Sequence, residues 1–572
     1  MRRRAASYAG QQRLVVDYYR IRRRLAFPLP LRSAVLPSVP VPTISDYPWT
    51  VWLLWELEER VNSLGWAAEW FGNPEYVRLA ARDLEALSEW PKFRQYEQPD
   101  LGAGHAGRLL WSALTKWRWP DAELRKKLRA ACVRHVEEVA PASDSHYRGI
   151  RTRQDLLSQP DVPRWLHNIP LIGTVGAALA AAAAGHPARA ALNQRIQAIM
   201  GAILDFRNTG YTEGVAYDGY ILDFVADWLE ALPLNERKEI LEHPHLKHFL
   251  EESYMLSAPG AMEQVAELGD VEPREMPFHF SAQAKLASLQ ADPLRAWYLE
   301  RWRSEWIRAD ALGALRASAS LPRRVAPEAG ALNAHYALVL RTGWESEDLA
   351  AAVSCSNSPM GHLQLDNGTV VIGTRGRWIL SDPGYQQYMQ DIEREFTIGP
   401  AAHNYPLING IAQDRKMPRL MRLGKTGDVL SAAVELAGCY PPAAKVRSVV
   451  RTVWVSKRNL VVVADHVEGE SVETLSYHWH AHPEAALWPQ DGAVLLHTPE
   501  AELWLASPQV PLSDDAIRRL PGSRGQLTVV AGVAPAPPVV WWVFALGGAP
   551  PRVEVSDRGR QIAVLGRQFE IQ

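Results

Sequence analysis

The chain has 572 residues, with 62 lysines and arginines against 64 aspartates and glutamates and a formal net charge of -2 at pH 7. This length exceeds what one hydrophobic core ordinarily supports, so we expect two domains. The near-neutral balance excludes the global basic field that marks many nucleic-acid-binding proteins, although a local cationic groove stays compatible with it.

The N-terminal segment 1–44 is basic, and we interpret it as an extension that precedes the first domain. It lacks the uninterrupted apolar region and the small-residue cleavage site of a secretory signal. Cys132, Cys355 and Cys439 are too few and too far apart for a disulfide framework or a zinc finger. We therefore expect a cytoplasmic location, with secretion or a periplasmic location by another route as the alternative.

Residues 45–316 repeat apolar side chains at helical spacing, as in WTVWLLWELEERVNSLGWAAEWF and GYILDFVADWLEAL. Breaks such as FGNPEY and LPLNER separate the helices into hairpins. Because no residue pattern returns at a fixed period, an incomplete (α/α) toroid is favoured over a helical solenoid. The apolar run 169–187 is rich in alanine and ends in Gly-His-Pro, which predicts a packed core helix and no membrane span.

Residues 317–572 change to strand-like alternation, for example in YALVLRTGW, SVVRTVWVSKRNLVVVADHV and PVVWWVFAL, with turn signals between the segments. This half predicts an antiparallel β-sandwich. The expected fold class is thus α+β and multidomain, with the toroid first and the sandwich second.

The segment WLHNIP places His167 and Asn168 at the predicted start of the alanine-rich helix. Unpaired backbone N–H groups and the helix dipole favour an anion there, so both side chains are candidates to bind a carboxylate. The alternative is structural: Asn168 caps the helix and His167 bonds to a backbone carbonyl.

The segment GYTEGVAYDGY (210–220) contains three glycines, which predict an irregular loop before the next helix. Such a loop would set Tyr211, Tyr217 and Tyr220 on the rim of a cleft, where a tyrosine can exchange protons with a sugar. The alternative is that the tyrosines pack against the helix and that Glu213 is a first-turn carboxylate.

His362, Gln364 and Asp366 alternate along a predicted strand and would share one face. Asp382 and His403 follow in the next strands and turns and are candidates to join them. A His/Asp/His set suits zinc, but glutamine is an unusual zinc ligand. The alternative is a buried polar network that holds the strand ends.

Taken together, the helical half, the loop GYTEGVAYDGY, the segment GHLQLDNGTVVIGTRGRWILSDPGYQQY and the segment AAHNYPLINGIAQ resemble the heparinase II/III-like polysaccharide lyases, the alginate lyase and heparinase type. The resemblance runs over most of the chain. It implies an (α/α) toroid followed by an antiparallel β-sandwich, with a uronic acid cleaved by β-elimination in a groove between them.

Carried over by position, the resemblance implies that Asn168 and His167 neutralise the uronate carboxylate, which acidifies the C5 proton by stabilising the developing enolate. Tyr217 would give or take a proton, with Tyr220 as the substitute if the loop register differs by one turn. His362 matches the family's catalytic histidine of the sandwich. The product would carry a 4,5-double bond.

The expected substrate-binding residues are Glu213, Tyr211, Arg164 and Arg377, the arginines because they can bind acidic or sulfated groups. The family often has a second histidine where this chain has Gln364, and that histidine binds a structural zinc together with residues that match Asp382 and His403. A structural Zn²⁺ therefore stays open here, and a hydrogen-bonded replacement is the stronger expectation.

The expected partner is an acidic polysaccharide or oligosaccharide, with no nucleic acid, and the oligomeric state is left open. One rival function is a glycoside hydrolase on the same toroid, with Glu213 and either Asp218 or Asp366 as its two carboxylates. Another is a protein that binds or exports polysaccharide without catalysis. The sequence does not distinguish heparan, chondroitin, alginate or a bacterial exopolysaccharide.

Overall fold

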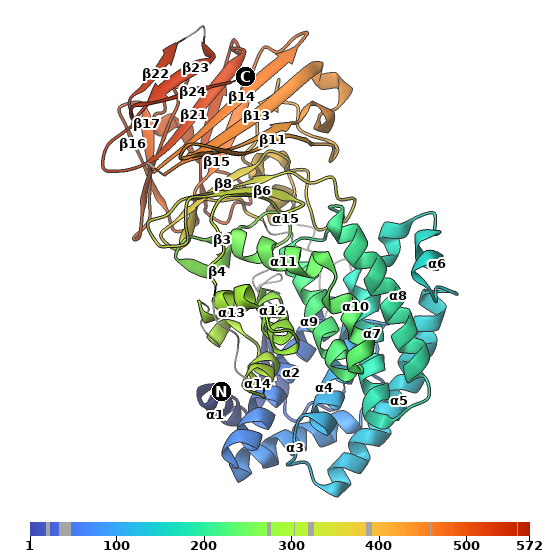
Figure 1. The fold of residues 1–572 in the computed structure, drawn as a ribbon. Coiled ribbons are helices and arrows are strands. Elements are labelled where there is room, and N and C mark those ends of the chain that lie inside the picture. The colour runs from blue at the N-terminus through green and yellow to red at the C-terminus, as the bar shows by residue number, and fades with distance from the viewer. Residues whose placement is uncertain are drawn as a thin grey trace.

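The computed structural model describes residues 1–18, 23–33, 47–271, 276–301, 304–317, 325–384, 392–457, 459–556 and 559–571. Helices occupy the N-terminal half and antiparallel sheets the C-terminal half, so the molecule has a helical body with a layered β-structure on top of it (Figure 1). The predicted toroid followed by a β-sandwich is confirmed.

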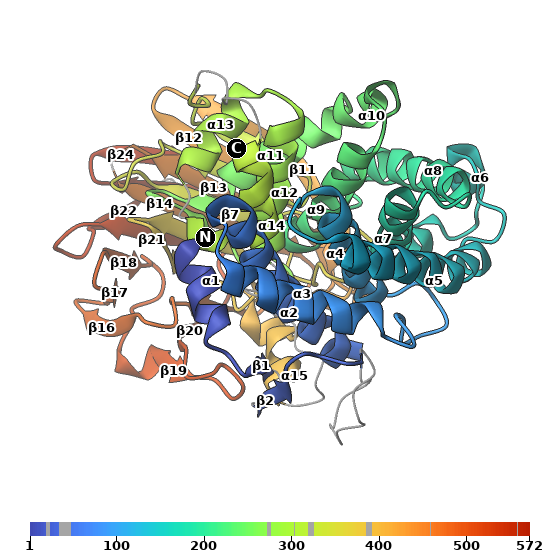
Figure 2. The same ribbon diagram turned by 90° about the horizontal axis from the view of Figure 1, so that it is seen from below.

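The helical half is built from an inner and an outer set of helices. Neighbours within the inner set pack against each other in the order α2, α4, α7, α9, α12, and α14 lies against both α12 and α2 (Figure 2). The inner helices are α2 (Tyr47–Phe71), α4 (Leu101–Thr115), α7 (Asn168–Ala184), α9 (Val215–Ala231) and α12 (Met276–Leu289). The helices around them are α3 (Pro74–Ser88), α5 (Ala122–His146), α6 (Arg153–Leu157), α8 (Arg189–Asn208), α10 (Leu234–Leu241), α11 (Pro244–Met255), α13 (Pro293–Glu300) and α14 (Ala309–Ala317).

The inner helices approach closely because small residues line their contacts. A Cβ atom on Gly107 would lie 2.4 Å from the carbonyl oxygen of Gly176, and one on Gly176 would lie 2.5 Å from that of Gly104. Both distances are shorter than any real contact, so α4 and α7 cross backbone to backbone. In the described part of the chain, Val162–Ala184 is the one segment long and apolar enough to span a membrane, and 78% of its window is buried inside the protein, as a core helix requires.

The N-terminal segment is not separate from this core. Helix α1 (Arg2–Ala9) packs against α2 and α3, and the hairpin of β1 (Arg13–Tyr18) and β2 (Arg23–Pro28) packs through β1 against α2. Leu14 and Val16 are buried in the same hydrophobic cluster as the inner helices. The boundaries 1–44, 45–316 and 317–572 remain sequence-based predictions.

The sheets of the C-terminal half are antiparallel throughout the described ranges. One sheet has the order β11-β12-β13-β14-β21-β18-β17-β16, another β5-β6-β7-β8-β9, another β10-β15-β20-β19, and a smaller one β22-β23-β24. The bounds are β5 (Ala331–Asn333), β6 (Ala337–Arg341), β7 (Ala350–Ser354), β8 (Val370–Thr374), β9 (Arg377–Leu380), β10 (Leu407–Ile408), β11 (Arg419–Thr426), β12 (Val429–Glu435), β13 (Val446–Ser456), β14 (Leu460–Gly469), β15 (Leu475–His480), β16 (Ala486–Gln490), β17 (Ala493–His497), β18 (Glu502–Ala506), β19 (Ile517–Arg519), β20 (Leu527–Val533), β21 (Val539–Leu546), β22 (Val553–Ser556), β23 (Gln561–Val564) and β24 (Arg567–Glu570).

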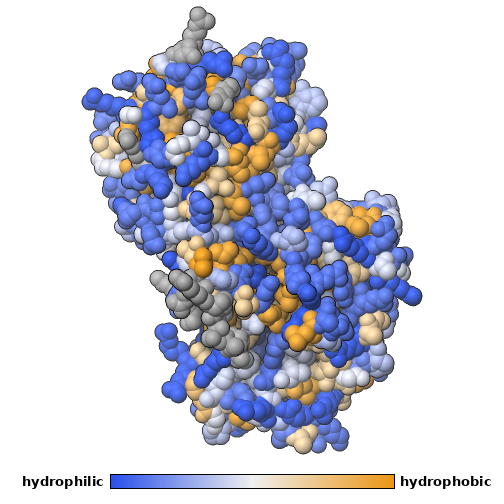
Figure 3. Space-filling view, viewed as in Figure 1, coloured by the Kyte–Doolittle hydropathy of each residue, from blue (hydrophilic) through white to orange (hydrophobic). Residues whose placement is uncertain are grey.

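The β5–β9 sheet is buried on both faces, and this fixes the sandwich to the helices. Leu338 and Val353 face a core shared with Val463 of the β11–β16 sheet. Val339 and Ala352 point the other way, into a cluster with the end of α11, the hairpin β3 (Ser257–Ala258) and β4 (Ala261–Val265), and α12. Continuous apolar runs are what a sheet covered on both sides needs. The surface is indented where the two halves meet (Figure 3).

Candidate active site

Helix α9 begins at the junction of the two halves and carries Tyr217 in its first turn. The preceding Gly214 has φ +88°, and a Cβ atom there would meet Leu363 of the sandwich half at 3.4 Å. The hydroxyl of Ser358 donates to the carbonyl of Thr212 at 2.7 Å, which ties the two halves together at this loop. Glycine at this position therefore lets residues 358–363 lie directly against the start of α9.

Tyr217 stacks on His362 across the junction. Their ring centroids lie 3.6 Å apart with an angle of 7° between the planes. Asp270, which follows β4, contacts Nδ1 of His362 through Oδ2 at 3.1 Å, and its backbone N–H donates to the His362 carbonyl at 2.8 Å. A carboxylate at Nδ1 fixes the orientation of an imidazole and leaves Nε2 for chemistry.

Glu213 connects the two histidines of the site. Its Oε1 lies 3.3 Å from Nδ1 of His167 and 3.9 Å from Nε2 of His362, and its Oε2 accepts from Arg207 at 3.1 Å. Burial acts to raise the pKa of Glu213, but the hydrogen bond from His167 and the charges of Arg207 and His362 outweigh it and hold the pKa below its usual value. Because none of its side chain is exposed, Glu213 is better placed to position the histidines than to contact a substrate directly.

His167 and Asn168 begin α7, as predicted. His167 is the N-cap residue but makes no side-chain cap bond, and Asn168 is the first helical residue, so the alternative in which Asn168 caps the helix is wrong. The His167 side chain is 44% exposed, whereas Asn168 is buried. The start of α7 therefore presents backbone N–H groups and an accessible imidazole next to Glu213.

A hollow of about 670 Å³ lies beside the segment that leads into α7, and Arg148, His146, Arg164 and Trp165 are among its lining residues. Burial, then the charges of Arg164 and His167, lower the pKa of His146. Arg164 and Trp165 come just before His167 in the chain. Basic groups beside an indole ring suit an acidic sugar.

Three predicted residues are not brought to the stacked pair. The Tyr220 hydroxyl accepts from Trp55 at 2.9 Å and contacts His105 inside the helical half, with none of the tyrosine exposed. Arg377 makes ion pairs with Glu484 and Glu500 on the sandwich surface. Tyr211 stacks on Phe206 with 5.5 Å between ring centroids.

Asp382 and His403 lie together, but Gln364 does not join them. Oδ2 of Asp382 is 2.9 Å from Nδ1 of His403, whereas the Gln364 amide donates to Asp270 at 2.9 Å. In the described ranges no third His, Cys, Asp or Glu completes a compact ligand set around this pair. Nε2 of His403 is buried without a hydrogen-bond partner among the described residues. These residues do not form the three-ligand set that a zinc site needs, and the structural zinc stays a prediction.

Two expectations about local structure were wrong. The strand predicted to carry His362 does not form there: β8 begins at Val370, and residues 361–369 form turns and bends. The reason is that the Asn367 side chain bonds to both backbone groups of Ser356 and so replaces the hydrogen bonds of a β-ladder. Tyr217 and Tyr220 lie within α9 and not in the loop before it.

The sequence analysis missed Arg207, Asp270 and Lys416. The Lys416 ammonium donates to the carbonyls of Met360 and Leu363 at 3.0 and 2.9 Å and so holds the turn that carries His362. Asp270 and Lys416 reach the site from distant segments, whereas Arg207 lies six residues before Glu213, and no local motif marks any of the three. Of the three residues, Asp270 is the one that directly follows a glycine, in LGD at 268–270, so this local pattern marks neither Arg207 nor Lys416.

Comparisons with known proteins agree with this architecture. Residues 324–528 match the family model described as Heparinase II/III-like, C-terminal. The chain is similar in structure to heparan sulfate lyase HepC from Pedobacter heparinus, with a TM-score of 0.58 and 12% identity over 100% of this chain and 88% of that chain. It is also similar to heparinase III, with a TM-score of 0.58 and 13% identity over 90% of this chain and 82% of that chain.

No curated protein sequence matches the chain. At such low identities the likeness to solved structures establishes the fold alone. The resemblance predicted from the sequence is confirmed in this form: residues 324–528 carry the heparinase II/III-like C-terminal domain, in a chain whose fold is that of heparin and heparan sulfate lyases.

Proposed function

We propose that the protein is a polysaccharide lyase that cleaves a uronic-acid-containing polysaccharide or oligosaccharide by β-elimination and leaves a 4,5-unsaturated uronate. The observation that carries this proposal is the stack of Tyr217 from the helical half on His362 from the sandwich half, with His362 oriented by Asp270. A tyrosine and a histidine in contact offer two proton-transfer groups at one place.

The roles follow from the chemistry of elimination. The substrate carboxylate would lie at the start of α7, where His167, Asn168 and the backbone N–H groups favour negative charge. Neutralising that carboxylate stabilises the enolate that forms when the C5 proton leaves. Tyr217 and His362 would take that proton and give one to the leaving oxygen, and Glu213 would hold the two histidines in place.

The carboxylates of the site argue against the hydrolase alternative. Glu213 and Asp218 share Arg207, and Asp366 accepts from Ser354 at 2.9 Å, with all three carboxylates buried. A glycoside hydrolase needs two carboxyl groups that reach opposite sides of the scissile bond. Elimination needs no hydrolytic water, so a site with enclosed carboxylates and two partly exposed histidines, His167 and His362, favours the lyase.

The hollow beside α7 extends the proposal to the sugar next to the cleaved bond. Arg148 and Arg164 would pair with carboxylates or sulfates, and the Trp165 ring would lie against a sugar face. These groups make a charged, uronate-containing chain a better substrate than a neutral glucan.

The test is ultraviolet absorbance of the unsaturated uronate during incubation with a panel of acidic polymers and oligomers. We expect a rise with at least one of them, and a loss of about 10²- to 10⁴-fold in His362→Ala, the range that removing a proton-transfer group costs. The matched control is His466→Ala, because His466 forms an ion pair with Glu468 on strand β14 of the sandwich and lies outside the candidate site.

The other outcomes are distinct. New reducing ends without absorbance would make the protein a hydrolase. Binding of an acidic polymer with no product of either kind, unchanged in His362→Ala, would make it a binding or export protein.

A further inference from the structure

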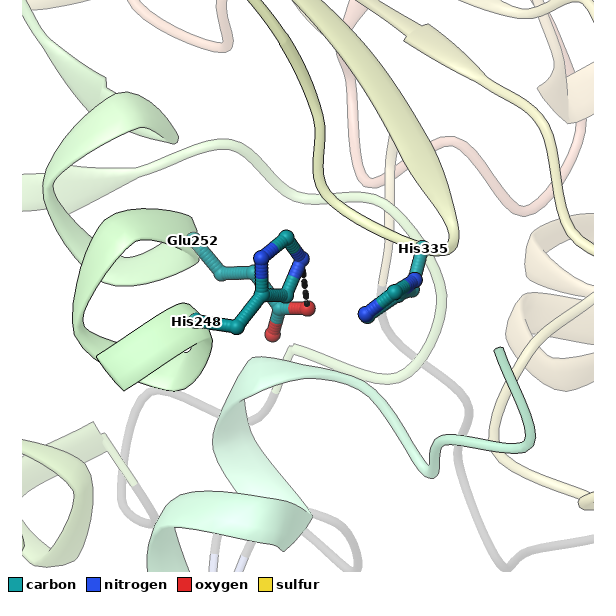
Figure 4. A group of neighbouring side chains, drawn as sticks. All are labelled: His248, Glu252 and His335. Carbon is teal, nitrogen blue, oxygen red and sulfur yellow. Dashed lines mark ion pairs between the residues drawn. The ribbon is translucent and has the colours of Figure 1, made fainter. Parts of the chain in front are cut away.

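A second group of titratable side chains lies at the junction, where the charge of Arg207 acts on Glu252 as it does on Glu213 of the candidate active site. Helix α11 carries His248 and Glu252 four residues apart, so both project from one face of the helix. Nε2 of His248 lies 3.2 Å from Oε1 of Glu252 (Figure 4). Glu252 is 2% exposed, so its carboxylate cannot rely on water for solvation.

His335 completes the group from the sandwich half. It lies in the turn between β5 and β6 with φ +60°, a left-handed conformation that costs a residue with a Cβ atom about 1 kcal/mol or more. The Asn333 side chain accepts from the His335 backbone N–H at 3.0 Å and holds this turn. The result is that the His335 ring points at α11, with its centroid 4.0 Å from that of His248 (Figure 4).

The group leaves a buried nitrogen without a hydrogen bond. Nε2 of His248 and Oε1 of Glu252 face each other as an ion pair, whereas Nε2 of His335 is buried and lacks a hydrogen-bond partner among the described residues. One ligand atom from each of the three side chains lies within 4.8 Å of the other two. Ligands about 2 Å from a tetrahedral ion are about 3.3 Å apart, so small side-chain movements would close the set.

A simple ion pair between His248 and Glu252 does not account for the whole group. The His335 ring is turned toward this ion pair by a left-handed backbone, and its buried Nε2 has no hydrogen-bond partner among the described residues. Such a nitrogen can offer a lone pair to a cation.

We propose that His248, Glu252 and His335 bind a zinc ion that joins helix α11 to the β5–β6 turn, with a water molecule as the fourth ligand. Two imidazoles and a carboxylate are a donor set that zinc accepts with tetrahedral geometry. The ion would also give the buried Nε2 of His335 a partner. Its role is to hold the two halves together, because its ligands come from both.

This zinc site would affect the candidate active site through the loop 210–214. A Cβ atom on Gly210 would lie 3.4 Å from the His335 carbonyl, and residues 210–214 lead directly to Glu213 and α9. The ion would thus fix the segment that carries Glu213. The proposal does not depend on the lyase activity, since binding and stability report it directly.

The experiment uses the full chain after removal of metals with a chelator and dialysis. We expect one Zn²⁺ bound per chain, a Tm raised by Zn²⁺ and, with Co²⁺ as the probe, the visible absorption of a tetrahedral cobalt site. His335→Ala and Glu252→Gln should each weaken Zn²⁺ binding by about 100-fold or more, because a direct ligand is lost.

The matched control is His403→Ala, which removes the histidine of the Asp382 pair and should leave Zn²⁺ binding at its parent value. Absence of stoichiometric Zn²⁺ in the parent chain overturns the proposal and leaves a buried ion pair beside a neutral histidine. Binding that His403→Ala abolishes, and that His335→Ala and Glu252→Gln do not, also overturns it and assigns the ion to Asp382 and His403.

Discussion

Helix α9 places two tyrosines, one turn apart, against two different histidine–carboxylate pairs. Tyr220 contacts Nε2 of His105, and Nδ1 of His105 lies 2.7 Å from Oε2 of Glu58. All of these residues belong to inner helices of the toroid, and neither Tyr220 nor His105 is exposed. Arg108 forms an ion pair with Glu58 at 2.7 Å, so the group is a closed and internally neutralised network.

The second group has the same residue types in a different place. Tyr217 stacks on His362, and Nδ1 of His362 lies 3.1 Å from Asp270. Here the tyrosine comes from the helical half and the histidine from the sandwich half, and the His362 side chain is 17% exposed. The neighbouring His167 side chain is 44% exposed.

The difference shows that a tyrosine, a histidine and a carboxylate in contact do not by themselves make an active site. Buried polar groups of this kind stabilise a fold when every member is satisfied and enclosed. Access for a substrate and contributions from two domains are what distinguish the group around Tyr217.

The largest expected effect separates the two tyrosines. Tyr217→Phe should lower the rate of unsaturated-uronate formation by about 10²- to 10⁴-fold, because it removes a proton-transfer group, with little change in Tm. Tyr220→Phe should keep most of the activity and lower the free energy of unfolding by about 1 to 3 kcal/mol, because the Trp55 N–H and Nε2 of His105 lose the hydroxyl that they contact. The rate of unsaturated-uronate formation and the free energy of unfolding in urea, measured for both variants, test this prediction.

Each variant is the control for the other, since each loses one hydroxyl from the same helix. The comparison would be refuted if Tyr220→Phe were inactive with normal stability while Tyr217→Phe kept its rate.

The next effect is the dependence of the protein's stability on pH, to which His105 of the closed network contributes. Burial, together with the charges of Arg108 and Arg308, lowers the pKa of His105 to about 4, although Glu58 acts to raise it. The unfolded chain takes up a proton near pH 6.5 and the folded chain does not until about pH 4, so stability is lost as the pH falls through this window. The contribution of His105 is about 3 kcal/mol. Denaturant unfolding measured between pH 7 and pH 4 should therefore show a shallower slope in His105→Asn.

Phe224→Leu is the control for this measurement. The Phe224 ring packs against His105 with 4.9 Å between centroids, so the change disturbs the same packing and keeps the titrating group. It should lower stability by a similar amount at every pH. An unchanged slope in His105→Asn would show that other groups carry the acid sensitivity.

The two tyrosines also show how far sequence reasoning reaches. The helical half and the sandwich followed from periodicity, and motif resemblance named Tyr217 and His362 as candidate site residues without predicting that their rings stack. The same pattern could not choose between Tyr217 and Tyr220, because one turn of an α-helix changes which neighbours a residue meets but not its local sequence. Asp270 was missed because its partner His362 lies 92 residues further along the chain. Arg207 lies only six residues from Glu213, but no motif marks it as the partner of that carboxylate.

The turn at 361–369 was misread for a different reason. Its alternation of apolar and polar residues imitates a strand, but Gln364, Asp366 and Asn367 are buried and bond through their side chains. A loop that satisfies its backbone in this way can be buried without a ladder. The metal-ligand candidates His248, Glu252 and His335 were not recognised because the third comes from the other half of the molecule.

The smallest expected effect compares two arginines that the sequence placed together as substrate-binding residues. Arg164 lines the hollow beside α7, whereas Arg377 is tied to Glu484 and Glu500 on the sandwich surface. Arg164→Ala should raise KM for an acidic oligosaccharide about fivefold with kcat unchanged, since one partly exposed charge contact contributes about 1 kcal/mol. Arg377→Ala should leave both constants within about twofold, because its surface ion pairs contribute little.

Steady-state kinetics at low and high salt would measure KM and kcat of the two variants, and the Arg164→Ala effect should shrink as salt screens the contact. If Arg377→Ala raised KM and Arg164→Ala did not, the substrate would lie along the sandwich surface and the hollow beside α7 would have no part in binding it.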